Sequence, residues 1–541
     1  MNLKNEDYIA FTGDTGDFDL LLNDYKLSES ALRFPNVNSI LIPKKAEYNL
    51  RKYVSKAMLK TVDPDFDIAV EKCLVFLSNL ASTYYTDSKW KPLNAMLLHE
   101  QSRNADNTFI YTKIIEVLTS GTSKGAFIEV DRSYQVGVQS KRFRFTEIYL
   151  KAGLVEYIIQ NTEIIRTRNK MYYKQLHEAF QNPICSNLIA MYPKIDLPTS
   201  EELLLIGRQL VKEGRCTKKG KILTMRNKHK DHYWLDIKNR SFVEDNIKLF
   251  EFLTSRGFMI PSVGDISSGC RVVDSFTLMP AWIREQITVD GKKLIECDYS
   301  AFHPNIAIKL YDGSLSYITH ELVAKEAKID VKDVKKLHLS FFNMKWDDMR
   351  KSALFNYYAE NESDMLARIY KDKNENGYKI TSRKMFKAEV DVMTDVIQYL
   401  SSKNIFVLYI YDALLCEEKD FIIVTETMNR IILKHGIKTN IKSKNLNFQE
   451  EISTELDEVE TLQQSKYFLN EIVNLYEVLP QLSFDVDDTM KIIYDIDNSR
   501  VEMRSLVRYI NRQRTQQKYN DYDGVQINTS TICKLKSLIE N

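Results

Sequence analysis

The chain has 541 residues, and this length predicts roughly three or four domains rather than one core. Hydrophobic residues make up 44% and charged residues 28%, which excludes a disordered chain. The net charge is +1, so contacts with nucleic acid would have to come from local basic patches. Seven scattered cysteines without a CxxC pair exclude a disulfide framework and favour a reducing cytoplasm. The sequence contains no apolar signal core and no long apolar run. It therefore predicts neither secretion nor a membrane span.

Composition shifts along the chain predict five segments. Scarce glycine (17) and proline (11) favour a mostly helical protein of the α+β class. The expected segments are a lead-in over 1–65, a helical domain over 66–150, a helical region with a basic loop over 151–264, a domain over 265–450 that carries the chemistry, and a helical tail over 451–541.

The second segment combines helices with a basic hairpin. Apolar residues recur at intervals of three and four between Asp67 and Ser120, which predicts three helices. Residues 126–145 alternate as in strands and end in basic side chains that include Arg142. This order resembles a winged helix-turn-helix, in which the wing contacts backbone phosphate. The alternative is a hairpin that only packs on its helices.

A basic stretch follows in the third segment. Residues 212–230 hold eight lysines or arginines and one acid, interleaved with glycine. Such a loop suits a phosphate backbone, because basic side chains neutralise phosphates whatever the base sequence. A solvated loop is the alternative. The candidate nucleic-acid contacts in the loop are Lys218, Lys219 and Lys221.

Two aspartates stand in apolar surroundings in the fourth segment. Asp298 ends the short strand LIEC, and a helical pattern follows it. Asp412 interrupts the apolar strand-like run 404–418. Taken alone, Asp298 is better explained as a helix N-cap and Asp412 as a turn residue. Together they indicate a shared divalent cation, since a buried carboxylate needs a compensating charge and two Mg²⁺ ions between carboxylates support phosphoryl transfer.

These motifs resemble those of the right-hand palm polymerases. DYSAFHPNI (298–306) is similar to motif A, with a family A-like start and a family B-like end. Tyr411-Asp412 is similar to motif C of family A and of the single-subunit RNA polymerases. Residues 270–287 resemble phage and mobile-element proteins with family A-like palms. The resemblance covers roughly residues 265–445 and implies a palm-like antiparallel sheet, with helical fingers inserted at 312–400 and a thumb-like region at 151–264.

The resemblance also implies roles for several residues. Asp298 and Asp412 would hold two Mg²⁺ ions, for which Mn²⁺ can substitute, and the backbone carbonyl of Tyr299 would complete a shell. The fingers helix would lie at 331–343, where cationic and aromatic side chains line the nucleotide pocket. Its candidates are Lys332, Lys336 and Phe342, and Lys335, Arg350 and Lys351 compete for the same role. Arg271 and Arg284 would contact template or primer phosphate. Glu389 matches an acidic position of the mobile-element group.

His303 occupies the sugar-discriminating position of the related families, five residues after Asp298. A bulky ring there predicts a preference for deoxynucleotides; the alternative is a helix-start residue packed on Pro304. The chain departs from the family in having Tyr411 where family A has histidine, and in lacking the glycine that ends motif B. No Asp-x-Glu pair of a proofreading exonuclease precedes residue 265.

The function expected from the sequence is therefore a DNA-dependent DNA polymerase without proofreading, acting in phage or mobile-element replication in the cytoplasm of a bacterial host. Its expected partners are a DNA primer-template, dNTPs and accessory replication proteins, with no membrane. One alternative is a DNA-binding replication-initiation protein with a degenerate, inactive palm. A nuclease or another two-metal phosphotransferase is the third, and the lysine-bearing helix between the aspartates argues against it.

Overall fold

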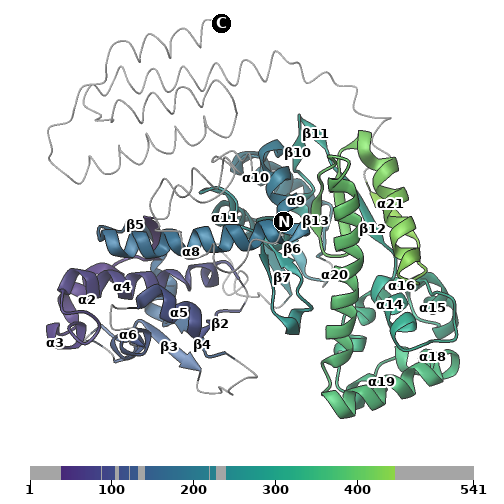
Figure 1. Ribbon diagram of the computed structural model, residues 1–541, viewed down its shortest axis with the longest axis horizontal. Coiled ribbons are helices and arrows are strands. Elements are labelled where there is room, and N and C mark those ends of the chain that lie inside the picture. Colours follow the sequence, from purple (N-terminus) through teal and green to yellow (C-terminus); the bar gives the residue numbers. More distant parts are fainter. Residues whose placement is uncertain are drawn as a thin grey trace, which may run out of the picture. The chain divides into compact units, whose positions relative to one another are not determined.

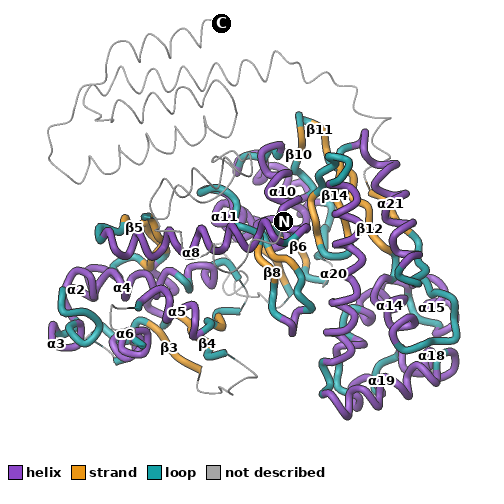
Figure 2. The backbone as a smooth tube through the Cα atoms, in the orientation of Figure 1, coloured by secondary structure: helices purple, strands orange, loops and turns teal. Residues whose placement is uncertain are grey.

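The computed structural model divides the chain into two compact units, Met1–Ser443 and Lys444–Asn541. It describes residues 38–86, 88–103, 109–120, 122, 124–131, 140–217, 220–226 and 239–444, which belong to the first unit except for the last residue. The predicted α+β class is confirmed, with many helices and small sheets that are mostly antiparallel (Figure 2). Within these ranges, no helix combines the length and apolar character needed to cross a membrane.

The first hydrophobic core is built by elements near the N-terminus (Figure 1). It begins at Ile40, so β1, α2 and α3 of the predicted lead-in belong to it. A three-stranded antiparallel sheet has the order β2-β4-β3, and β1 pairs with β5. The elements are β1 (Ser39–Pro43), α2 (Ala46–Tyr53), α3 (Lys56–Leu59), α4 (Phe66–Ser78), η4 (Ala81–Tyr84), β2 (Lys91–Pro92), α5 (Ala95–Ser102), α6 (Ile110–Thr119), β3 (Ile128–Asp131), β4 (Arg142–Phe145), α7 (Glu147–Ala152) and β5 (Leu154–Ile158).

Helix α4 is the centre of this core. Asp65 caps its start by accepting hydrogen bonds from the backbone N–H groups of Asp67 and Ile68. Glu71, only 2% exposed, accepts hydrogen bonds from the Tyr157 hydroxyl and from the backbone just after β5. The buried carboxylate therefore ties α4 to the end of β5 at the cost of its own desolvation.

Elements of the middle region lead to the second core. Helix α8 belongs to both cores: Ile164 packs in the first, Tyr173 and Leu176 in the second, and Ile165 against both. The elements are α8 (Thr162–Gln181), α9 (Pro183–Met191), η5 (Tyr192–Lys194), α10 (Ser200–Lys212), β6 (Ile222–Thr224), β7 (Arg240–Phe242), α11 (Val243–Thr254), β8 (Ser262–Val263), η7 (Ile266–Ser268), β9 (Val272–Val273), α12 (Ser275–Leu278) and α13 (Ala281–Arg284).

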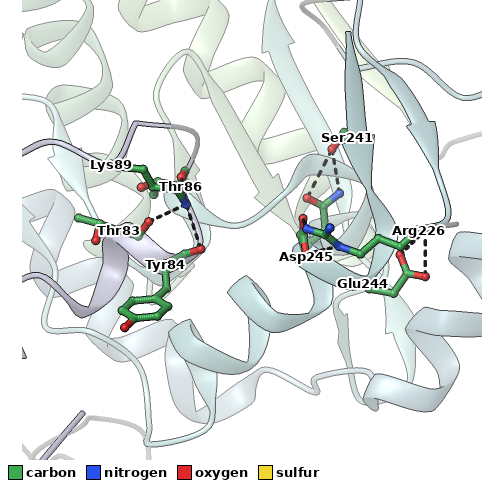
Figure 3. Close-up of polar contacts among 9 residues, drawn as sticks. Thr83, Tyr84, Thr86, Lys89, Arg226, Ser241, Glu244 and Asp245 are labelled. Carbon is green, nitrogen blue, oxygen red and sulfur yellow. Dashed lines mark hydrogen bonds and ion pairs between the residues drawn. The ribbon is translucent and has the colours of Figure 1, made fainter. Parts of the chain in front are cut away.

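Basic side chains hold irregular segments of these two regions in place through hydrogen bonds and ion pairs (Figure 3). Lys89 Nζ donates to the carbonyls of Thr83, Tyr84 and Thr86, which have no partner within a regular helix. Arg226, after β6, binds Asp245 in the first turn of α11. These contacts fix where the loops leave the helices.

The four-stranded sheet β13-β14-β12-β15 lies in the second core. Strands β12 and β14 are antiparallel, with Asp298 opposite Ala413, and β13 and β14 form a hairpin. The elements are β10 (Thr288–Val289), β11 (Lys292–Lys293), β12 (Ile295–Tyr299), α14 (Phe302–Leu310), α15 (His320–Ala327), α16 (Val331–His338), η8 (Phe341–Asn343), α17 (Trp346–Arg350), α18 (Leu354–Asn361), α19 (Ser363–Asn376), α20 (Ile380–Ser401), β13 (Leu408–Ile410), β14 (Ala413–Cys416), η9 (Glu418–Asp420), α21 (Phe421–Lys434) and β15 (Ile441–Lys444).

The helices between β12 and β13 contain a pair of neighbouring histidines, of which His338 is buried and His320 is half-buried. His338 Nε2 lies 2.8 Å from the Tyr358 hydroxyl, and His338 Nδ1 lies 3.1 Å from His320 Nδ1. Burial, followed by the charge of His320, lowers the pKa of His338 to about 3. Burial, followed by the charge of Lys335, lowers the pKa of His320 to about 4. Both rings are therefore neutral at neutral pH.

The histidine pair predicts a loss of stability in acid. Above pH 6.5 the two histidines are uncharged in both the folded and the unfolded chain. Below pH 6.5 they bind protons in the unfolded chain but not in the folded one, which favours unfolding. The free energy of unfolding should fall by about 2 kcal/mol for the buried His338 between pH 6.5 and about 4.5, and by less for the half-buried His320, whose charge water screens. Urea unfolding at several pH values, compared between wild type and His320→Asn/His338→Gln, measures this loss. Equal pH slopes in the two proteins would contradict it.

Candidate active site

The two predicted aspartates come together at one end of the sheet. Asp298 lies on β12 opposite Ala413, and the backbone N–H of Tyr299 donates to the carbonyl of Asp412 at 3.4 Å. Both aspartates are half-buried. The strand register therefore brings two carboxylate-bearing residues, 114 positions apart in the sequence, to neighbouring backbone positions.

The turn of a hairpin presents Asp412. The sequence predicts one long strand at 404–418, and the structure instead forms β13 and β14, joined by Tyr411 and Asp412. Tyr411 has a φ of 60°, as the tight two-residue turns of hairpins require. A left-handed conformation costs a non-glycine residue roughly 1–2 kcal/mol. The Arg271 guanidinium, 5.0 Å from the centre of the Tyr411 ring, is a contact that stabilises this turn.

The donor set at this point fits magnesium. Two carboxylates and the backbone carbonyl of Tyr299 are oxygen ligands, which hard cations prefer. Among the described residues, no group of three or more His, Cys, Asp or Glu side chains could hold a metal ion. Mg²⁺ commonly binds one or two carboxylates and takes its remaining ligands from water and substrate phosphates. A pair of aspartates is therefore sufficient for this ion.

An ion-pair cluster lies beside the aspartates. The Glu389 carboxylate on α20 is fully buried and binds Arg271 Nε at 2.7 Å and Arg271 Nη2 at 2.5 Å. His303 Nε2, in the first turn of α14, lies 2.7 Å from Glu389 and 3.0 Å from Arg271. Burial opposes ionisation, yet His303 and Arg271 hold the pKa of the Glu389 carboxyl below its usual value. We refer to these three residues as the Glu389 cluster.

Helix α20 packs closely against the loop that carries Arg271, and this packing positions the Glu389 cluster. The Arg271 guanidinium lies 3.8 Å from the centre of the Phe386 ring, one turn before Glu389. Gly269 has a φ of +68°, and a Cβ added there would lie 2.3 Å from Cβ of Phe386. Only glycine allows the loop before Arg271 to lie directly on α20.

The structure does not bring every predicted residue to the aspartates. Phe342 is 1% exposed, and its ring packs against Phe341 and Tyr358, so it is a core residue. Arg284 Nη1 donates to the carbonyls of Phe276 and Met279, and burial lowers its pKa. Arg284 therefore closes the end of α12 and is not a free surface cation.

Other predicted contacts lie on exposed surfaces. Lys332 and Lys336 are exposed on α16, whose neighbours are α15 and η8. Arg142 on β4 is paired with Asp131 of β3. Lys221 is part of the loop before β6, whereas Lys218 and Lys219 lie outside the described residues. The roles of the exposed residues stay predictions.

Helix α20 also carries candidate triphosphate-binding residues that were not predicted from the sequence. The Nε of Arg383 is buried and has no hydrogen-bond partner in the part of the chain that the structure describes. Lys387 follows four residues later, exposed and paired with Asp391. Arg383, Phe386 and Lys387 share one face of α20. The signal for them was the run SRKMFK (382–387), in the helix that precedes the hairpin with Asp412.

Comparisons with known proteins add little. No family profile and no curated protein matches the chain. Among solved structures, the chain is similar to the POL domain of Pol1 from M. smegmatis, in complex with DNA primer-template and dNTP. The two are 9% identical, with a TM-score of 0.33, and the match covers 52% of this chain and 72% of that chain. A likeness this weak does not define the function of the chain.

Proposed function

We propose that this chain is a template-directed nucleotide polymerase, namely a DNA-dependent DNA polymerase without proofreading in phage or mobile-element replication. One observation carries the proposal: β12 and β14 are hydrogen-bonded in the register that puts Asp298 beside Asp412. Two carboxylates on adjacent antiparallel strands, one of them in a hairpin turn, suit two-metal transfer of a nucleotide.

The reaction follows from the groups around this pair. A primer 3′-hydroxyl attacks the α-phosphate of a dNTP, and pyrophosphate leaves. Asp298, Asp412 and the carbonyl of Tyr299 would hold Mg²⁺, which when bound lowers the pKa of the hydroxyl and neutralises developing charge. Cationic side chains would hold the triphosphate, because positive charge near it stabilises the transferred group. The candidates are Arg383 and Lys387 on α20, and Lys332 and Lys336 on α16.

The Glu389 cluster supports a preference for deoxynucleotides. His303 follows Asp298 by five residues, and its ring is anchored by Glu389 and Arg271 rather than by packing alone. Phe386 lies 5.4 Å from the His303 ring centre. A ring held in one place excludes a ribose 2′-hydroxyl more effectively than a mobile one, since a mobile ring can move aside. Glu389 is thus proposed as a positioning residue for His303.

Primer extension by the purified protein tests the proposal. The reaction should contain Mg²⁺ and compare dNTPs with rNTPs on DNA and RNA templates. We expect extension with dNTPs on DNA, lost on addition of EDTA and restored by excess Mg²⁺ or Mn²⁺. Failure to extend any primer-template with either metal, while the protein is folded and binds DNA, would refute the polymerase.

The N-terminal core favours the second candidate, a DNA-binding initiator with an inactive palm. Its order of helix α4, strand β2, helices α5 and α6 and strands β3 and β4, with sheet order β2-β4-β3, would suit the proposed winged helix. Helix α6 would enter a groove, with Thr112 and Lys113 exposed on it. Sequence-selective duplex binding without extension would favour this candidate, and both activities together would show that the core serves the polymerase.

A further inference from the structure

The first two helices of the N-terminal core, α2 and α3, carry a dense group of positive charges (Figure 1). Residues 44–60 contain six lysines or arginines and a single acid, Glu47. Glu47 and Asp67 both pair with Arg51, so neither of them neutralises a lysine of this stretch. Its lysines are exposed and form no ion pair in the part of the chain that the structure describes: Lys44, Lys45, Lys52, Lys56 and Lys60.

Tyrosine rings lie between these lysines. Tyr48 is 52% exposed, and its hydroxyl accepts a hydrogen bond from Lys52 Nζ at 2.6 Å. The same ammonium lies 5.1 Å from the centre of the Tyr48 ring and 5.6 Å from that of Tyr53. Lys124, in the loop before β3, lies 5.5 Å from the Tyr53 ring. We refer to Tyr48, Lys52, Tyr53 and Lys124 as the α2 surface.

The charge of the α2 surface is not used within the core. Lys113 on α6 pairs with Glu116, and Arg142 on β4 pairs with Asp131. The lysines of the α2 surface have no such carboxylate partner in the ranges that the structure describes. A phosphate that binds to the α2 surface therefore does not have to displace an existing ion pair.

The combination of side chains favours one class of partner. Lysines neutralise phosphates whatever the base sequence, and an exposed aromatic ring stacks on an unpaired base. The bases of a duplex already stack on one another, so the ring of Tyr48 has more to offer a single strand. A membrane surface would require several apolar side chains that can insert. Within residues 38–60, all of which the structure describes, Tyr48 is the only large apolar residue that is exposed.

We propose that the α2 surface binds single-stranded nucleic acid, with a base stacked on Tyr48 and the adjacent phosphates held by Lys52 and Lys124. Helix α2 has 8 residues and is about 12 Å long, which matches roughly four nucleotides of a stacked strand. Stacking and charge read no base edges, so binding tolerates any sequence and weakens with salt. The proposal does not depend on the reaction at the aspartates.

Photocrosslinking to the full chain tests the α2 surface directly. An oligonucleotide that carries 5-iododeoxyuridine is irradiated with the protein, and the crosslinked peptides are mapped by mass spectrometry. We expect a crosslink in the peptide that contains Tyr48 with the single strand and none there with the matching duplex. Crosslinks that occur only in other peptides would overturn the proposal.

The salt dependence of this crosslink tests the phosphate contact. Its yield is titrated against the oligonucleotide at several salt concentrations. The slope of log affinity against log salt should be about 0.7 smaller in Lys52→Gln than in wild type, because one phosphate contact is lost. Lys151→Gln is the matched control, since Lys151 is exposed on α7 of the same core and paired with Glu147. Equal slopes in the two variants would contradict the proposal.

Two further measurements separate the alternatives. Tyr48→Phe keeps the ring and should keep the crosslink, so its loss in a folded variant would show that stacking is not the contact. Vesicles that contain phosphatidylserine test the other anionic partner: vesicle binding that depends on Lys52, without a crosslink to the oligonucleotide, would assign the surface to a membrane and overturn the proposal. Primer extension measured in parallel reports on the aspartates alone, so an inactive polymerase leaves the crosslink unaffected.

Discussion

Replacing Asp412 with asparagine is expected to abolish nucleotide transfer while leaving the fold intact. Asparagine has the same shape, so the hairpin turn and the hydrogen bond from Tyr299 to the Asp412 carbonyl remain. The lost charge is the one that would hold the cation, and Asp298 alone cannot replace it. We expect single-nucleotide incorporation to fall on the order of 10³-fold or more, about 4 kcal/mol in the barrier. Asp298→Asn should behave alike.

The control for the Asp412→Asn and Asp298→Asn variants is Glu417→Gln. Glu417 follows β14 at its other end and is paired with Lys419, so its charge is remote from the turn. This variant should extend primers as wild type does, and all three variants should bind a primer-template equally in filter binding. Retained incorporation in Asp412→Asn would remove the basis of the assigned site.

The second large effect is expected at Glu389. Glu389→Gln removes the buried charge that faces Arg271 and His303, and it leaves the Arg271 guanidinium, 19% exposed, without its ionic partner. Breaking a buried pair on one side costs about 3–5 kcal/mol. The midpoint of urea unfolding should fall accordingly, and the ratio of kcat/KM for dNTP over rNTP should fall about tenfold as His303 loses its anchor.

Asp391→Asn, two residues further along α20, separates these effects from a general weakening of the helix. Asp391 is half-exposed and paired with Lys387, and such surface pairs contribute at most about 1 kcal/mol. We expect a midpoint close to that of wild type and unchanged sugar selection. If Glu389→Gln unfolds like Asp391→Asn, the cluster does not stabilise the fold. If Glu389→Gln lowers the unfolding midpoint but leaves the selection of dNTP over rNTP unchanged, Glu389 does not position His303.

The sequence predicted the helical, α+β character of the chain and the strand that carries Asp298. It did not predict the register that sets Asp298 beside Asp412, because periodicity within a strand says nothing of its partner. The turn at Tyr411 and Asp412 was considered only as the alternative reading of Asp412, since its residues are not those usual in tight hairpins. No glycine or asparagine lies between Ile405 and Glu418, so this run is predicted as one strand, and only the pairing of Ile410 with Ala413 shows two.

Pairing between residues far apart in the sequence also explains why the residues around the site were predicted only in part. Arg271 and Glu389 are 118 residues apart; the sequence singled out Arg271 as a phosphate contact and Glu389 as an acidic position of the mobile-element group, but not their pairing. Phe342 carries the residue type of a nucleotide pocket, but its burial against two aromatic neighbours, Phe341 and Tyr358, places it in the core. Arg383 and Lys387 have the spacing that drew attention to Lys332 and Lys336, and only tertiary packing distinguishes the two helices.

Helix α8 has a consequence for how the protein can be divided. Its first turn completes one core and its later turns complete the other, so neither core has all its walls without it. A fragment that ends near residue 150 would leave Ile164 out of the first core, and one that starts after α8 would expose the face that Tyr173 and Leu176 cover. Fragments meant to isolate either half should therefore each carry α8.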